Sequence, residues 1–346
     1  MDKKYTIKDI AQMAGVSKGT VDRVLHNRGK VSTEALEKVN EVMASINYEP
    51  NLIARNLKNN KISKVCVILP DPNIDPYWAP CLEGIKDAVE EFKAFNFTVE
   101  SHYFDPEDTS SFLKVNKTVL EISPDAVLIA PFFYKETIKV ASKYEDAGII
   151  VATFNNQIKS EDIKSFVGQD LHKSGRVAAK LLDILSRNKN IVIIHIDESV
   201  KNASHMQAKE KGFRSYFEDK SQAANISTLK LKNPDFELNF EKFLTENPEL
   251  SGVFVTTSKV YQIAKILEKG NKNHIGVIGY DLVEENIQFL NNGHIDFLIN
   301  QNPKRQVYLS ITHIAENLVY GKEINPVTLL PIDIINSENL ETYQNN

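Results

Sequence analysis

The chain has 346 residues, 42% apolar and 25% charged, a composition typical of a globular protein with enough apolar material for a core. At about 150 residues per domain, this length predicts two or three domains. Residues 1–61 carry a net charge of +4 and residues 62–346 a net charge of −9. A small basic segment ahead of an acidic body suggests that the segment contacts an anionic partner.

Composition also excludes several classes of protein. No apolar run approaches the roughly 20 residues of a membrane-spanning helix, and residues 1–30 lack the apolar stretch of a signal peptide. We therefore expect a cytoplasmic protein with no membrane partner. The two cysteines, Cys66 and Cys81, are too few for a disulfide framework or a structural zinc site, so we predict no metal and no cofactor.

Catalysis is one alternative, but the sequence has no P-loop, Gly-x-Gly-x-x-Gly, His-Glu-x-x-His or Gly-x-Ser-x-Gly motif. His195, beside Asp197 and Glu198 at the end of an expected strand, fits either a metal cluster or a cleft-lining or structural histidine. The second interpretation is favoured because the usual spacing of metal ligands is missing. We expect no enzymatic activity and no catalytic residues.

Residues 1–49 are expected to form a small all-α domain. Thr6, with Asp9 three residues later, predicts the start of a first helix, which ends at Gly15. Ser17 is placed to cap a second helix, and a third follows Ser32 with Leu36 on its apolar stripe. A helix, a glycine turn and a second capped helix within about 20 residues form the helix-turn-helix pattern.

In that motif the second helix enters the DNA major groove. The pattern directs Lys18, Gly19, Asp22 and Arg23 outward, where Lys18 and Arg23 can donate to guanine. The helix N-terminus around Ser17 and Thr20 suits a phosphate group. A small helical domain with a solvated polar face is the alternative.

Residues 50–61 are predicted to connect this domain to the rest of the chain. Their apolar part, Asn51 to Lys58, has eight residues, fewer than the roughly 12–15 that an isolated helix needs in water. It should therefore be helical only when docked. A plain linker is the alternative.

From residue 62 onward, continuous apolar runs alternate with amphipathic stretches. The runs that we expect to be strands are Val65–Leu69, Ala126–Ala130, Ile149–Phe154, Ile191–Ile196, Val253–Val255 and Ile275–Ile278. This texture predicts parallel sheets covered by helices on both faces, and its length favours two doubly wound lobes. We expect one lobe at about residues 62–169 and 302–330, and the other at about 170–301 and 331–346.

Ligands of such folds bind at the carboxyl ends of the strands. Tyr77 and Trp78 follow the first expected strand, and their flat faces suit a sugar ring. Both aromatic residues could instead belong to the lobe core.

The residues from Tyr5 to Gly29, with Val31-Ser32 and Ile46 to Asn51, resemble the head of the lac repressor (LacI/GalR) family of bacterial regulators. The resemblance implies that Lys18, Gly19 and Arg23 read bases. It also implies a hinge helix that pairs with its twin in the minor groove, with Leu57 as the apolar wedge. The family usually has serine at the position of Asp22, so the operator sequence is open. The residues implied in DNA binding are Thr6, Ser17, Lys18, Gly19, Thr20, Asp22, Arg23, Asn51, Ala54, Arg55 and Leu57.

Residues 64–341 resemble the periplasmic sugar-binding proteins, the ribose-binding protein in particular. Asp75-Pro76-Tyr77-Trp78, Ile278-Gly-Tyr-Asp281 and Ile299-Asn-Gln-Asn-Pro303 resemble their ligand loops, and Lys209 replaces their usual arginine. Asn155-Asn156 and Thr257-Ser258 stand where that pattern has Asp-Arg and Asn-Asp. The implied effector residues are Tyr77, Trp78, Asn155, Asn156, Lys209, Thr257, Asp281 and Gln301.

Together these patterns predict a homodimeric, nucleoid-associated transcription regulator, with double-stranded operator DNA and a monosaccharide or sugar derivative as partners. A single head contacts only about 600–1,000 Å² of protein surface, which favours a dimer on a pseudo-palindromic site. A DNA-binding protein that has lost its ligand and a sugar transport receptor are the alternatives.

Overall fold

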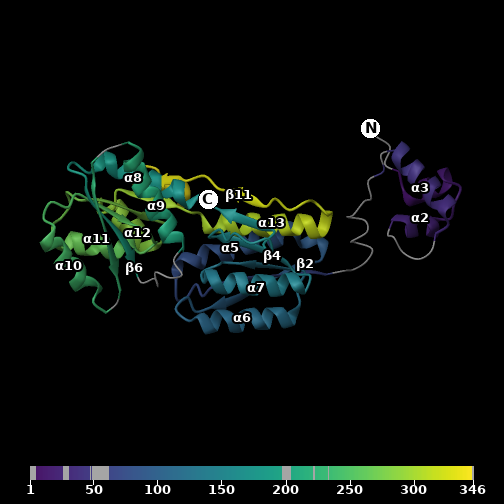
Figure 1. Cartoon of the computed structure of the whole chain (residues 1–346), viewed down its shortest axis with the longest axis horizontal. Helices are drawn as coiled ribbons and strands as arrows, with labels where there is room; N and C mark the ends of the chain where they lie inside the picture. Colours follow the sequence, from purple (N-terminus) through teal and green to yellow (C-terminus); the bar gives the residue numbers. More distant parts are fainter. Residues whose placement is uncertain are drawn as a thin grey trace. The chain divides into compact units, whose positions relative to one another are not determined.

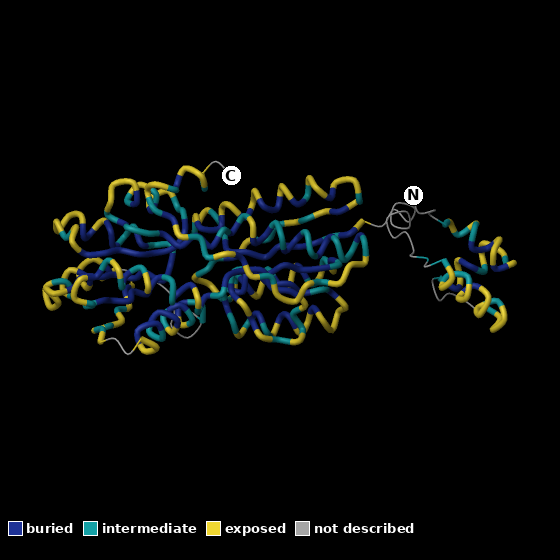
Figure 2. The backbone as a smooth tube through the Cα atoms, turned by 90° about the horizontal axis from the view of Figure 1, so that it is seen from above, coloured by how far each residue is buried: buried dark blue, intermediate teal, exposed yellow. Residues whose placement is uncertain are grey.

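The computed structural model describes residues 5–25, 31–46, 48, 62–196, 204–220, 223–232 and 234–344. Internal contacts divide the chain into two units, residues 1–60 and residues 61–346, and each is described by itself. In Figure 2 the strands of the larger unit lie in its buried interior, and the exposed backbone is concentrated on the helices and loops around them. Within the described residues, no helix is both long and apolar enough to cross a membrane.

The smaller unit is helical, with α1 (Ile7–Met13), α2 (Lys18–Leu25) and α3 (Thr33–Ser45). The predicted capping box is present: Thr6 Oγ1 accepts from the Asp9 backbone, and Asp9 accepts from the Thr6 backbone. Gly15 has φ +65°, which allows the tight turn before α2. The core is centred on Ile10, Val21 and Val39.

One prediction for the third helix is wrong. Leu36, expected on the buried stripe, is 39% exposed, whereas Val39 is fully buried. The core of three short helices is too narrow to cover the whole apolar stripe of α3.

The larger unit contains two six-stranded sheets, which confirms the prediction of two α/β lobes. In the first sheet the order is β11-β5-β4-β3-β1-β2, and all neighbouring strands are parallel. Its strands are β1 (Ser63–Pro70), β2 (Phe97–Phe104), β3 (Ala126–Ile129), β4 (Ile150–Asn155), β5 (Ser165–Gly168) and β11 (Val327–Leu329). This sheet forms the N-lobe.

Two pairs of helices cover the N-lobe sheet. Figure 1 shows α5 (Ala79–Phe92) and α13 (Pro303–Tyr320) on one side of the sheet, and α6 (Thr109–Ile122) and α7 (Tyr134–Asp146) on the other. The 3-10 helices η1 (Pro76–Trp78) and η2 (Lys93–Phe95) flank α5. Because both faces are covered, β3 is buried along its whole length and β1 and β4 along most of theirs, as their continuous apolar sequences predict.

In the second sheet, that of the C-lobe, the order is β12-β10-β9-β8-β6-β7. Its strands are β6 (Asn190–Ile196), β7 (Asn225–Leu231), β8 (Gly252–Val255), β9 (Gly276–Tyr280), β10 (Phe297–Asn300) and β12 (Asp333–Ile335). The edge strand β12 is antiparallel to β10. This sheet is therefore mixed, whereas a purely parallel sheet was predicted. Around it lie α8 (Leu171–Leu185), α9 (Ser204–Asp219), α10 (Phe236–Glu246), α11 (Val260–Lys269), α12 (Glu284–Asn291) and α14 (Leu340–Gln344).

The chain passes between the lobes three times, after β5, after β10 and after β11. The buried side chain of Gln169 connects all three passages. Its Nε2 donates to Asn300 O at 2.9 Å and to Pro331 O at 2.6 Å. One amide group therefore holds together the three segments about which the lobes can move.

Candidate functional site

A pocket lies between the two lobes and encloses about 520 Å³, including the part open to solvent. Most of its lining residues follow the carboxyl ends of strands, where ligands of parallel sheets bind. They are Asp75, Tyr77, Trp78, Pro131, Phe132, Asn155, Asn156, His205, Lys209, Thr256, Thr257, Ser258, Asp281 and Gln301. All eight residues predicted from the sequence to bind an effector are among them.

Asp75 organises the aromatic wall of the N-lobe. Its Oδ1 accepts from the Tyr77 backbone at 3.2 Å, and its Oδ2 accepts from Trp78 Nε1 at 3.1 Å. The rings of Tyr77 and Trp78 meet edge to face, with centroids 4.8 Å apart. Both side chains are part of the N-lobe core and also line the pocket, so the two interpretations proposed for them are both correct.

Two asparagines at the end of β4 contribute amide groups. Asn155, in the left-handed region with φ +69°, donates from Nδ2 to the Tyr77 hydroxyl. Asn156 Nδ2 donates to Ser204 Oγ on α9 at 2.9 Å, which is a direct bond between the lobes. The amide groups of Asn155 and Asn156 supply hydrogen-bond donors and acceptors to the N-lobe wall and add no charge.

Asp281 is the most enclosed acid of the pocket, with 2% of its surface exposed. Burial raises the pKa of this carboxyl to about 6, although Lys209 and the hydrogen bonds from Gln301 act in the opposite direction. Gln301 donates to it twice, from its backbone nitrogen at 2.9 Å and from Nε2 at 2.7 Å. Gln301 O in turn accepts from Gln306 Nε2 on α13 at 2.7 Å, so the acid of the C-lobe is connected to a helix of the N-lobe.

Lys209 is buried in the C-lobe wall. Its Nζ donates to Thr256 O at 3.0 Å and lies 3.6 Å from the centre of the Tyr280 ring. The pocket wall thus contains an ammonium group, Lys209, and a carboxyl group, Asp281. The positive charge of Lys209 lowers the pKa of Asp281 and so favours its ionised form.

His195 stands behind the pocket in a hydrogen-bonded chain. Its Nε2 lies 2.7 Å from Glu210 Oε2, and its Nδ1 lies 2.8 Å from Thr256 Oγ1. The hydrogen bond to His195 is the main cause that lowers the pKa of Glu210 to about 2. Asp197 and Glu198 lie outside the described residues. Because both ring nitrogens of His195 have partners in the wall, the structure favours the structural interpretation of this histidine.

Sequence reasoning missed part of the pocket. Pro131 and Phe132 follow β3, whose apolar sequence was predicted, so the rule that ligands bind at strand ends would have found them. Asp75 and Ser258 belong to the same motifs as Tyr77 and Thr257, which were predicted to bind the effector. Thr256 directly follows the predicted strand Val253–Val255, so the same rule would have found it, whereas His205 carried no sequence signal.

On the head, Thr6, Ser17, Lys18, Gly19, Asp22 and Arg23 are exposed, and Thr20 is half-buried. Ser17 Oγ accepts from the Thr20 backbone at 3.1 Å, as a capping residue does. Arg23 Nε donates to Gly19 O at 3.1 Å, which holds the guanidinium along the outward face of α2. Asn51, Ala54, Arg55 and Leu57 lie outside the described residues, so the predicted hinge helix stays a prediction.

Two family models match the chain. Residues 6–51 match the bacterial regulatory proteins of the lacI family, and residues 65–323 match a periplasmic binding protein domain. Among curated relatives, the ribose operon repressor of Lactococcus lactis subsp. lactis (strain IL1403) is 26% identical over 81% of each chain. The sucrose operon repressor of the same subspecies is 23% identical over 95% of this chain and 98% of the other.

A solved structure assigned as a LacI transcriptional regulator from Bacteroides fragilis is 32% identical, with a TM-score of 0.78. The match covers 82% of this chain and all of the other. Together with the two family models, it establishes that the chain belongs to the lacI family of bacterial regulatory proteins, with a periplasmic-binding-protein-like domain after its helix-turn-helix head.

Proposed function

We propose that this protein is a transcriptional repressor whose affinity for operator DNA is set by a sugar or sugar derivative in the interlobe pocket. One observation carries the proposal: eight residues chosen from the sequence as effector ligands, spread from Tyr77 to Gln301, line a single pocket. The names of the curated relatives, the ribose and sucrose operon repressors, support the same class of effector.

The chemistry of the pocket suits a polyhydroxylated ring. Trp78 and Tyr77 offer aromatic surface, and the amides of Asn155 and Gln301 can each donate and accept hydrogen bonds. Asp281 accepts hydrogen bonds from hydroxyl groups. A sugar hydroxyl is both a donor and an acceptor of hydrogen bonds, so it fits a wall that contains carboxylate, amide and ammonium groups.

Occupancy of the pocket is expected to change how the lobes close, because ligand contacts span both walls. The three lobe crossings tied by Gln169 are the points about which closure occurs. In a cytoplasmic homodimer, a change in lobe geometry would alter the spacing of the two hinges and hence the fit of both heads on a pseudo-palindromic operator. Such coupling is typically about 1–3 kcal/mol, or a factor of about 5–150 in affinity.

A thermal-shift screen with sugars, sugar acids and sugar phosphates tests the pocket. A ligand that binds only the folded protein raises the Tm. We expect at least one sugar or derivative to do so, and we expect Gln301→Leu to abolish the shift. Gln262→Leu, on α11 away from the pocket lining, is the matched control and should respond like the wild type. A regulator that has lost its effector would show no shift with any of these compounds.

A further inference from the structure

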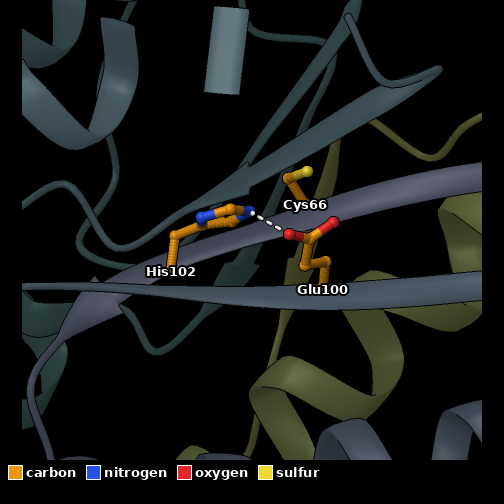
Figure 3. A group of neighbouring side chains, drawn as sticks. All are labelled: Cys66, Glu100 and His102. Carbon is orange, nitrogen blue, oxygen red and sulfur yellow. Dashed lines mark ion pairs between the residues drawn. The ribbon is translucent and has the colours of Figure 1, made fainter. Parts of the chain in front are cut away.

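Three side chains with metal-binding atoms meet on one face of the N-lobe sheet. The strands β1 and β2 are parallel neighbours, and Cys66 lies opposite Glu100 in their register. His102 stands two residues after Glu100, so it points to the same face of β2. The Cys66 thiol, the His102 ring and the Glu100 carboxylate place one atom each within 4.8 Å of one another, and Figure 3 shows the His102 ring facing the Glu100 carboxylate with Cys66 beside them.

The distances and the burial of the three groups suit a cation. His102 Nε2 lies 3.6 Å from Glu100 Oε1 and, although it is buried, it has no hydrogen-bond partner. The other carboxylate oxygen, Oε2, is 3.2 Å from Lys64 Nζ. The Cys66 side chain is fully buried, whereas that of Glu100 is 48% exposed. The cluster therefore has a dry side formed by the sheet and a side open to water.

We propose that Cys66, Glu100 and His102 form a binding site for a divalent transition metal ion of the Zn²⁺ type. Thiolate, imidazole and carboxylate are the three protein ligand types of zinc, and three protein ligands with one open position form a common zinc arrangement. Water on the side of Glu100 completes the coordination.

The geometry of the cluster is close to what such an ion needs. Bonds of about 2.0–2.3 Å in a tetrahedron place neighbouring ligand atoms about 3.3–3.8 Å apart, which matches the His102–Glu100 distance of 3.6 Å. Since all three atoms lie within 4.8 Å of one another, the thiol of Cys66 needs to move by no more than roughly 1 Å. Lys64 stays on the outer carboxylate oxygen, the position in which hydrogen-bonding partners commonly hold a ligating carboxylate. Formation of the metal–sulfur bond releases the thiol proton to solvent.

The site would join the edge strand β2 to β1, the first strand after the residues that connect to the head. Each ligand is carried by a strand of fixed register, so little ordering is needed before the ion binds. The sequence gave no indication of this site, because Glu100 and His102 lie 34 and 36 residues after Cys66.

The experiment titrates the full-length, reduced, metal-free protein with Zn²⁺ against a competing chelator, and with Co²⁺ as an absorption probe. We expect one equivalent to bind, with a thiolate-to-cobalt charge-transfer band. Cys66→Ser should remove this band, and Glu100→Gln and His102→Gln should each weaken Zn²⁺ binding about tenfold or more. Because Glu100 is half exposed, its variant tests the site even if Cys66→Ser does not fold.

Two variants serve as matched controls. Cys81→Ser removes the other buried thiol, which lies on α5, and His294→Gln removes a histidine paired with Glu268 at 3.1 Å. Both should bind Zn²⁺ like the wild type. The proposal is overturned if no cobalt–thiolate band forms, or if the ligand variants bind Zn²⁺ as tightly as the controls. Lys64, Glu100 and His102 would then be only a surface ion cluster above an inert thiol.

Discussion

Asn156 and Ser204 form a hydrogen bond of 2.9 Å that joins the two lobes across the pocket. Asn156 directly follows β4 of the N-lobe, and Ser204 begins α9 of the C-lobe. The bond exists only when the lobes are close together. It therefore contributes to the closed arrangement and not to the stability of either lobe alone.

Loss of this bond should weaken effector binding. Asn156→Ala and Ser204→Ala are each expected to lower effector affinity by roughly 3–10-fold, the equivalent of one hydrogen bond of about 0.5–1.5 kcal/mol. The double variant should lose little more than Asn156→Ala, which removes the same bond as Ser204→Ala and also an amide that lines the pocket. Isothermal titration calorimetry measures the affinities. Asn317→Ala, which removes a 2.7 Å bond to Lys322 O on the N-lobe, should leave them unchanged.

Protonation of Asp281 should link stability to pH. Burial raises the pKa of its carboxyl from 3.8 to about 6 in the folded protein. Since the folded state then binds the proton more tightly than the unfolded chain, this group stabilises most below about pH 4 and its contribution is lost as the pH rises through 6. The loss is on the order of 2–3 kcal/mol, at about 1.4 kcal/mol per unit.

Comparison with Asp281→Asn isolates this effect. Urea unfolding between pH 4 and 8 can be followed by the fluorescence of Trp78, the single tryptophan of the chain. The difference in unfolding free energy between wild type and variant should change between pH 4 and 6 and be flat above pH 7. A difference that is constant over the whole range would contradict a raised pKa at Asp281.

Gln169→Leu should disturb movement between the lobes. The variant removes both hydrogen bonds to the other crossings and leaves two buried carbonyl groups without that donor, at an expected cost of about 1–3 kcal/mol in unfolding free energy. Because the crossings carry the movement, the effector affinity should change as well. Asn116→Leu removes the hydrogen bond that the buried Asn116 amide donates to Phe112 O inside the N-lobe. This variant should lower the unfolding free energy and leave the effector affinity unchanged. Equal effects of the two variants on effector affinity would argue against a role of Gln169 in closure.

The outward face of α2 should determine DNA specificity. Lys18→Ala and Arg23→Ala are each expected to reduce discrimination between the selected operator and other sequences by about 1–3 kcal/mol. Fluorescence anisotropy at fixed salt measures both affinities. Lys38→Ala removes an exposed lysine of α3 that pairs with Glu34, and should leave discrimination intact.

The strands β1, β3, β4, β6, β8 and β9 were predictable because both faces of each sheet are covered, which requires continuous apolar sequences in them. The interior strands β5 and β10, with four residues each, were not among the expected runs. The strands β2 and β7 were not found. They lie at the edges of their sheets and consist mostly of half-buried and exposed residues, so they lack such a run. The antiparallel β12 has only three residues, too few for any periodicity.

The pocket was predictable in outline because strand ends and a family resemblance point to the same residues. The contacts that connect it to the rest of the protein were not. Gln169 bonds to groups 131 and 162 residues away, and the convergence of Cys66 with Glu100 depends on strand register. Pairings of this kind are set by the folded backbone, which local sequence patterns do not encode.

Occupancy of the pocket is expected to change operator affinity. The operator Kd of the full chain, measured at fixed salt with and without a sugar that raises the Tm, tests this coupling most directly. We expect a change of about 5–150-fold for the wild type, and none for Gln301→Leu. A sugar that stabilises the protein through this pocket and leaves the operator Kd unchanged would contradict this expectation.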